Sequence, residues 1–141
     1  MPRILGVDYG ERRVGLALSD PTATIAQPLP TLKRRKGKRP PVAPIARLAD
    51  ENDVREIVVG LPLTLEGEDS DWTREVREFG RKLQERTGCT VAFHDERLTS
   101  VRAERAVRSL GLSKQKREKK ERVDAAAAVL ILQAYLDSRE T

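Results

Sequence analysis

The sequence predicts an α/β fold built on a mixed sheet of five strands, with helices on both faces. Short runs rich in Val, Ile and Leu occur at residues 3–8, 14–19 and 56–60, and a further strand is expected at residues 90–94. A short turn containing glycine joins the first two runs, which favours an antiparallel hairpin. The later runs alternate with segments of helical spacing, which favours parallel strands joined by right-handed crossovers.

The third strand and the first helix are predicted from local patterns between the hairpin and residue 50. Residues 27–32 contain Pro28 and Pro30, and prolines are tolerated at the edge of a sheet, so this segment is expected to be an irregular edge strand. Over residues 42–50 the apolar positions recur at helical spacing. The run at 56–60, which we expect to stop at Gly60 and Pro62, is typical of a buried parallel strand.

Three further helices are predicted in the second half of the chain. Trp72, Val76, Phe79 and Leu83 follow one another at steps of four, three and four, which places them on one face of a helix and in the core. A second helix extends from Thr99 or Ser100 to residue 110. A third covers residues 123–136, after a basic stretch, and the predicted order is strand, strand, strand, helix, strand, helix, strand, helix, helix.

Length and composition indicate one soluble domain covering residues 1–141. The longest run of small and apolar residues, 125–132, is much shorter than the roughly 20 residues that a membrane span needs. At its start the sequence has a charged residue, a short apolar strand and Asp8, and this order of residues is not that of a signal peptide. The chain has a single cysteine, Cys89, which excludes an internal disulfide bond, so we expect a cytoplasmic protein. Cys89 itself is expected to be a small, buried hydrophobic residue.

The net charge of +5 is unevenly distributed. Residues 33–39 and 114–122 together contain 12 of the 27 basic residues but only 2 of the 22 acidic ones, so the remainder of the chain is acidic. Two concentrated basic stretches beside an acidic body favour a protein that binds a polyanion such as nucleic acid. Two solvated loops with no partner remain the alternative.

Carboxylates follow or interrupt apolar elements at three places. Asp8 ends the first strand, Glu96 (next to Asp95) follows the last one, and Asp124 lies in the final helix on the face of Ala128 and Ile131. Ligands of open sheets gather at the carboxyl ends of parallel strands, so these acids should converge. Asp124 could instead be an acid in the first turn that the helix dipole favours.

Converging carboxylates predict a metal site, because one of them would otherwise be protonated. Oxygen ligands favour Mg²⁺ or Mn²⁺, and two such ions can promote hydrolysis of a phosphodiester. We therefore predict Asp8, Glu96 and Asp124 as catalytic metal ligands, with Asp95 as a further ligand. His94, the only histidine, is expected to pack or to donate a hydrogen bond.

Basic side chains near these acids are predicted to contact nucleic acid. Arg97 is next to the acids and could hold a phosphate or a carboxylate. The hairpin tip and the two basic stretches supply the rest of the predicted set: Arg12, Arg13, Lys33, Arg34, Arg35, Lys36, Lys116, Arg117, Lys119 and Lys120.

Four blocks of this sequence resemble the YqgF family, also called RuvX. They are Val-Asp-Tyr-Gly at 7–10 with 13–20, Val-Gly-Leu-Pro-Leu at 59–63, Asp-Glu-Arg-Leu-Thr at 95–99, and Val-Asp-Ala-Ala-Ala at 123–127. The blocks occur in the family's order and cover nearly the whole chain. Glu11 and Thr64 depart from the usual residues, and both lie in predicted loops.

The resemblance implies an RNase H-like fold, shared with the RuvC-type Holliday junction resolvases. It also implies a metal-dependent nuclease, acting as a Holliday junction resolvase or on the 5′ end of pre-16S ribosomal RNA. The family's acidic positions fall on Asp8, Glu96 and Asp124, with Asp95 adjacent.

Two other functions remain open at the level of sequence. The Asp-x-Gly hairpin also resembles the phosphate loop of sugar kinases and actin-like ATPases. A catalytically silent RNA-binding assembly factor could retain the same acids. A resolvase that cuts a junction symmetrically needs two active sites, so a homodimer is possible, although no stretch marks its interface.

Overall fold

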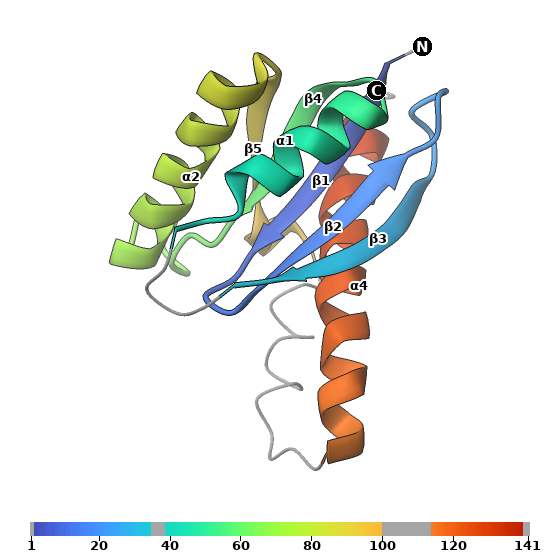
Figure 1. Cartoon of the computed structure of the whole chain (residues 1–141). Helices are drawn as coiled ribbons and strands as arrows, with labels where there is room; N and C mark the ends of the chain where they lie inside the picture. Colours follow the sequence, from blue (N-terminus) through green and yellow to red (C-terminus); the bar gives the residue numbers. More distant parts are fainter. Residues whose placement is uncertain (1, 35–38, 100–113, 140–141) are drawn as a thin grey trace.

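The computed structural model describes residues 2–34, 39–99 and 114–139; for residues 114–124 it describes the backbone alone. Its centre is a five-stranded sheet with the strand order β3-β2-β1-β4-β5 (Figure 1). The strands are β1 (Arg3–Tyr9), β2 (Arg13–Ser19), β3 (Ala26–Lys33), β4 (Val54–Leu61) and β5 (Thr90–Asp95).

Strand directions confirm the mixed sheet. β1 pairs antiparallel with β2, and β2 pairs antiparallel with β3, whose prolines lie at the sheet edge. β1 pairs parallel with β4, and β4 pairs parallel with β5. The carboxyl ends of β1, β4 and β5 therefore meet at one end of the sheet, where the sequence predicts the acids.

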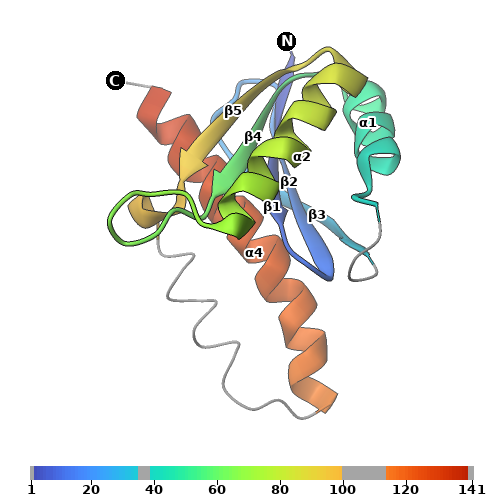
Figure 2. The ribbon, with the colours of Figure 1, turned by 90° about the vertical axis from the view of Figure 1, so that its left-hand side faces the viewer.

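Helices cover both faces of the sheet, as predicted. α1 (Val42–Glu51) and α2 (Asp71–Thr87) bury Ile45, Val76 and Phe79 against the side chains that β1 and β4 present to one face. α4 (Lys114–Arg139) buries Ala128, Ile131 and Leu132 against the other face (Figure 2). β1 and β4 thus lie between two apolar layers, which explains their continuous apolar sequences.

The core position predicted for Trp72 and Phe79 is confirmed. Phe79 is 1% exposed, and its ring stacks on Tyr9 with 3.9 Å between centroids. Trp72 is half-buried and stacks on the same tyrosine at 5.5 Å. Cys89 is buried too, as predicted, with its thiol 3.3 Å from the Val54 carbonyl oxygen.

α4 begins earlier than the sequence predicts. We expected a helix from residue 123, whereas the backbone is helical from Lys114, so the second basic stretch belongs to the helix. Lysine, arginine, glutamate and glutamine all have high helix propensity, and Glu118 and Glu121 alternate with basic residues at helical spacing. Thr99 has extended backbone after the short helix that follows β5. The rest of the helix predicted from Thr99 or Ser100 to residue 110 lies outside the described residues.

α4 lies unusually close to β1 at Gly6. A Cβ atom on Gly6 would lie 2.7 Å from Leu132 Cβ and 3.1 Å from the Ala128 carbonyl oxygen. Only glycine leaves space for this approach. No helix within the described residues has the length and apolar character needed to cross a membrane.

The last turns of α4 are fastened to β4 by a polar cluster. The Tyr135 hydroxyl donates a hydrogen bond to Glu56, whose carboxylate is also 2.7 Å from an Arg139 guanidinium nitrogen. Burial, followed by the hydrogen bond to Glu56, raises the pKa of Tyr135 to about 12. The folded protein therefore keeps the tyrosine proton at a pH where the unfolded chain loses it.

This cluster predicts a loss of stability at alkaline pH. The protonated Tyr135 contributes its full stabilisation of the folded state below the unfolded tyrosine pKa of about 10. This stabilisation should disappear as the pH rises to about 12. We expect the free energy of unfolding of the wild type to fall more steeply over this interval than that of Tyr135→Phe, measured by urea denaturation. Equal slopes for the two proteins would contradict the role given to this hydroxyl.

Candidate active site

Asp8 lies on the face of the sheet that α4 covers. Ile4 on the same strand belongs to the core under α4, and Gly6 contacts that helix. Successive side chains of a strand alternate between faces, so Asp8 follows Ile4 and Gly6 to the α4 side. Its side chain is 5% exposed, next to the carboxyl end of β1.

Glu96 reaches the same face from the end of β5. It opens a short 3₁₀ helix, η1 (Glu96–Leu98), and is only 2% exposed. Its Cγ lies 3.3 Å from the position that a Cβ of Gly60 would occupy. Val7 pairs with Val59, so the next residues, Asp8 and Gly60, are neighbours across the β1–β4 ladder. The structure thus brings Asp8 and Glu96 together around Gly60.

The sequence predicts Gly60 near the acids, at the end of a strand, but not as a residue inside the strand whose missing side chain makes space for Glu96. We expected this glycine to stop a strand, but β4 continues to Leu61, so Gly60 lies inside the strand. A Cβ there would be 2.5 Å from Ile131 Cδ1 as well as close to Glu96. A glycine inside a strand pattern often marks a close approach, and that was the available signal.

The backbone of α4 carries Asp124 toward the same end of the sheet. α4 runs antiparallel to β1, and its amino-terminal half extends past the carboxyl end of β1 (Figure 1). Ala128 is level with Gly6. Asp124 is one helical turn before Ala128, and Asp8 is two strand residues beyond Gly6; both steps are about 6 Å. Asp124 and Asp8 are therefore at about the same level along the sheet.

Asp95 has a different partner from Glu96. Phe93 packs toward α2, so Asp95, two residues later on β5, is on the face opposite α4. Its carboxylate accepts hydrogen bonds from the Arg97 backbone N–H at 2.9 Å and from Arg97 Nη2 at 2.7 Å. These bonds lower the pKa of Asp95. The sequence predicts that Arg97 holds either a phosphate or a carboxylate, and in the structure its guanidinium holds the Asp95 carboxylate.

His94 packs on the α4 side, in register with Gly60. Its ring meets the edge of Tyr135 with 6.5 Å between centroids, so the predicted packing role agrees with the structure. Burial lowers the pKa of His94, and the nearby charge of Asp95 opposes this shift. The ring is therefore expected to be neutral at neutral pH.

The predicted basic residues that are described gather at the same end of the sheet. Arg12 is exposed in the turn between β1 and β2, and Arg13 pairs with Lys33 across β2 and β3. The Arg34 backbone N–H donates to the Arg12 carbonyl oxygen at 2.8 Å, and its guanidinium lies 4.7 Å from the centre of the Tyr9 ring.

The remaining members of the basic set are outside what the structure describes in atomic detail. Arg35 and Lys36 lie outside the described residues. Lys116, Arg117, Lys119 and Lys120 are described by backbone alone, and this part of α4 projects beyond the carboxyl end of β1 (Figure 1). Their predicted contacts with nucleic acid stay a prediction.

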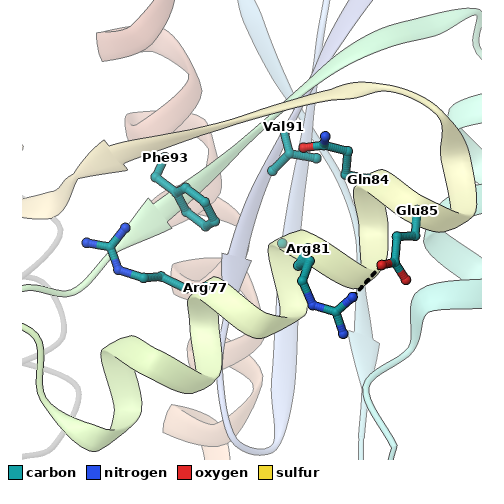
Figure 3. A pocket seen from close by; sticks show the side chains of 7 residues that line it. Arg77, Arg81, Gln84, Glu85, Val91 and Phe93 are labelled. Atoms are coloured by element: carbon teal, nitrogen blue, oxygen red, sulfur yellow. Dashed lines mark hydrogen bonds and ion pairs between the residues drawn. The ribbon is translucent and has the colours of Figure 1, made fainter.

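A hollow of about 390 Å³ lies away from the acids, between α2 and β5 (Figure 3). Val91 and Phe93 line its apolar part. Arg77 forms two hydrogen bonds to Asp69, at 2.8 and 3.0 Å, and Arg81 is paired with Glu78 and Glu85. The guanidinium groups of Arg77 and Arg81 at this hollow are thus already paired with carboxylates of neighbouring residues.

The donor set of Asp8 and Glu96 fits a hard divalent cation. Both side chains offer only carboxylate oxygens, the ligands that Mg²⁺ and Mn²⁺ prefer. Within the side chains that the structure describes, no three acidic, histidine or cysteine residues are grouped closely enough to hold a metal ion. A third ligand would come from Asp124, whose backbone position is suitable.

A central aspartate on β1, a mixed sheet of this order and a long final helix across the acidic end define an RNase H-like domain. The family model described as "RuvX: Holliday junction resolvase" matches residues 2–138. The chain belongs to the RuvX family, and the resemblance of the four sequence blocks to that family is confirmed.

Curated relatives match over almost their full lengths. A protein of Koribacter versatilis is 49% identical over 137 residues, which cover 97% of this chain and 88% of the relative. A protein of Chloroflexus aggregans is 48% identical over 136 residues, covering 96% and 94%. Both carry the name "Putative pre-16S rRNA nuclease".

Solved structures confirm the fold. The fowlpox virus resolvase bound to Holliday junction DNA superposes with a TM-score of 0.60 at 11% identity, covering 99% of each chain. The Thermus thermophilus RuvC complex with a Holliday junction substrate gives a TM-score of 0.57 at 12% identity, covering 99% of this chain and 96% of that one. At such low identity these matches support the RNase H-like fold alone.

Proposed function

We propose that this protein is a metal-dependent endonuclease that cleaves the 5′ end of pre-16S ribosomal RNA in the cytoplasm. The observation that carries the proposal is the pair of buried carboxylates, Asp8 and Glu96, on one face of the sheet around Gly60. The names of the full-length relatives support the substrate. Residues 1–141 act as one nuclease domain in this proposal.

Asp8, Glu96 and Asp124 would hold the metal, with Mg²⁺ or Mn²⁺ as the fitting ions. When bound, a pair of such ions supplies an activated water and stabilises the leaving oxygen of a phosphodiester. The chain itself fixes the carboxylates. Asp8 is held in a central strand, and Glu96, the first residue of η1, is packed against Gly60. Asp95 contributes indirectly, since it accepts hydrogen bonds from the backbone and the side chain of Arg97 in η1.

Basic residues at the same end of the sheet would hold the nucleic-acid backbone. Arg12, Arg13 and Lys33 lie around the β1–β2 turn, and the basic half of α4 projects past the acids. Contacts of this kind fix the position of a phosphate backbone and carry little base specificity. Binding should therefore weaken steeply as the salt concentration rises.

Cleavage of a Holliday junction is the second candidate function. The description of the family model favours it, and its substrate is also a phosphodiester backbone. Symmetric cleavage of a four-way junction needs two active sites, so this activity would require a two-fold homodimer. Sedimentation of the protein with and without junction DNA tests that requirement.

The deciding experiment compares labelled substrates: a pre-16S rRNA 5′ end, a four-way DNA junction and a linear duplex of the same sequence. Each is incubated with the protein in Mg²⁺ or Mn²⁺, and an Asp8→Asn variant controls for contaminating nucleases. We expect site-specific cleavage of the RNA that needs metal and Asp8. Tight, salt-dependent RNA binding without cleavage in either metal would favour the silent assembly factor instead.

A further inference from the structure

Two exposed leucines lie beside the acidic end of the sheet. Among the described residues, three large hydrophobic side chains are strongly exposed: Ile25 at 56%, Leu65 at 77% and Leu98 at 72%. Leu65 belongs to the loop that follows β4, and Leu98 ends η1, two residues after the buried Glu96. A single exposed leucine needs no explanation, but two beside a candidate catalytic site do.

A network around Arg97 connects the two leucine-bearing segments. Arg97 Nη1 donates to the Leu65 carbonyl oxygen at 3.3 Å, while Asp95 accepts from the same guanidinium. A Cβ on Gly67 would lie 2.9 Å from Arg97 Nη1, and its φ of +83° suits glycine. The loop after β4 is thus held against η1, and the neighbouring leucines remain exposed.

Each segment is also closed by its own backbone hydrogen bonds. In the loop after β4, the Thr64 N–H donates to the Glu68 carbonyl oxygen and the Gly67 N–H to the Thr64 carbonyl oxygen, both at 2.9 Å. At the end of η1 the Thr99 N–H donates to the Glu96 carbonyl oxygen at 3.2 Å. Ordered segments present a side chain at a lower entropic cost than mobile ones.

We propose that Leu65 and Leu98 form an apolar contact for an unstacked nucleobase next to the scissile phosphate. This inference rests on the proposed nuclease function. Apolar side chains can occupy the space left between separated base steps, where the faces of the bases are apolar. Leu65 and Leu98 follow the carboxyl ends of β4 and β5, at the end of the sheet that bears Asp8 and Glu96, so a strand whose phosphate reaches these acids would pass the leucines. A regular duplex, in which every base is stacked, cannot offer such a base.

The contact would give the enzyme a preference for branched or single-stranded regions over linear duplex. This selectivity comes from an apolar contact, so it should be insensitive to salt, unlike the contribution of the basic residues. The two contributions can therefore be separated by experiment.

The test uses Leu65→Ser, Leu98→Ser and the double variant. Ile25→Ser is the matched control, because Ile25 is also strongly exposed but lies in the β2–β3 loop, at the other end of β2 from the hairpin turn. The probes are a four-way DNA junction with 2-aminopurine at the branch point and a single-stranded RNA containing the same base. Fluorescence of this base reports unstacking and is recorded in EDTA, so that no cleavage is needed.

We expect wild type and Ile25→Ser to change the fluorescence of at least one probe, and the double variant to lose most of that change. The double variant should bind that probe about 10-fold more weakly, with an unchanged dependence on salt. Equal affinity and fluorescence for the double variant and Ile25→Ser would overturn the inference. Absence of any fluorescence change with wild type would overturn it as well.

The proposed function can fail separately from this inference. If no substrate is cut in Mg²⁺ or Mn²⁺, the nuclease assignment is wrong, while the fluorescence titration still shows whether the leucines contact a base. If cleavage depends on Asp8 but the double variant cuts branched and linear substrates in the wild-type ratio, the nuclease assignment stands and the leucine contact is rejected.

Discussion

Asp8→Asn is expected to lower metal-dependent cleavage at least about 100-fold. Loss of an outer-shell partner of a metal ligand already costs roughly 10- to 100-fold in affinity or activity, and a direct ligand should cost more. Asparagine has nearly the same shape, so the buried position next to Gly60 remains filled. The measurement is the rate of cleavage of the best substrate at saturating Mg²⁺ and Mn²⁺.

Two further readouts separate loss of the metal from loss of the fold. Calorimetric titration with Mn²⁺ should show clear binding to the wild type and none to Asp8→Asn. A bound ligand also stabilises the fold, by about 2.7 kcal/mol at 100 times its Kd. Mn²⁺ should therefore raise the melting temperature of the wild type and leave that of the variant unchanged.

Glu11→Gln is the matched control, because Glu11 is an exposed acid in the turn three residues after Asp8. This control should bind Mn²⁺ and cleave like the wild type. Unchanged Mn²⁺ binding by Asp8→Asn would remove Asp8 from the proposed metal site. Cleavage by the variant at the wild-type rate would show that the catalytic assignment is wrong.

The architecture of the sheet was readable from local sequence. The continuous apolar runs of β1 and β4 reflect burial on both faces, and the short glycine turn between β1 and β2 favours their antiparallel pairing. Asp8 was predictable for the same reason, since a carboxylate that ends such a run must be buried near the end of a strand. The sheet architecture and the burial of Asp8 could be predicted because each depends only on residues that are close together in the sequence.

The roles of Asp95 and Glu96 could not be separated by sequence. They are adjacent, and both follow the same strand. In the structure Asp95 keeps the strand alternation and faces α2, whereas Glu96 begins η1 and lies over Gly60 on the other side. The two side chains face opposite ways because β5 ends at Asp95 and η1 begins at Glu96, and because Gly60 on β4 has no side chain to block Glu96. Neither of these causes is a local property.

Substituting Gly6 by valine should have the largest effect on stability. The new Cβ would meet Leu132 Cβ at 2.7 Å and a backbone oxygen of α4 at 3.1 Å, so the helix has to move. Overpacking of this kind typically costs about 1–3 kcal/mol, and the rigid backbone on the α4 side favours the upper end of that interval. Thermal and urea denaturation should both show the loss.

Gly88→Asn provides the control for Gly6→Val. Gly88 ends α2 with a φ of +73°, a conformation that asparagine tolerates, and a Cβ at this position would have no neighbouring atom within 4 Å. The melting temperature of Gly88→Asn should stay close to that of the wild type. Equal stability of Gly6→Val and Gly88→Asn would contradict the close packing of α4 on β1.

The same substitution of Gly6 also tests how the active site is assembled. α4 carries Asp124, so a helix displaced from Gly6 should move that residue away from Asp8 and Glu96, which stay on the sheet and η1. At a temperature where Gly6→Val is still folded, we therefore expect weaker Mn²⁺ binding together with slower cleavage. Wild-type Mn²⁺ affinity in a folded, destabilised Gly6→Val protein would mean that the position of α4 does not set the metal site. The third ligand would then have to be sought outside this helix.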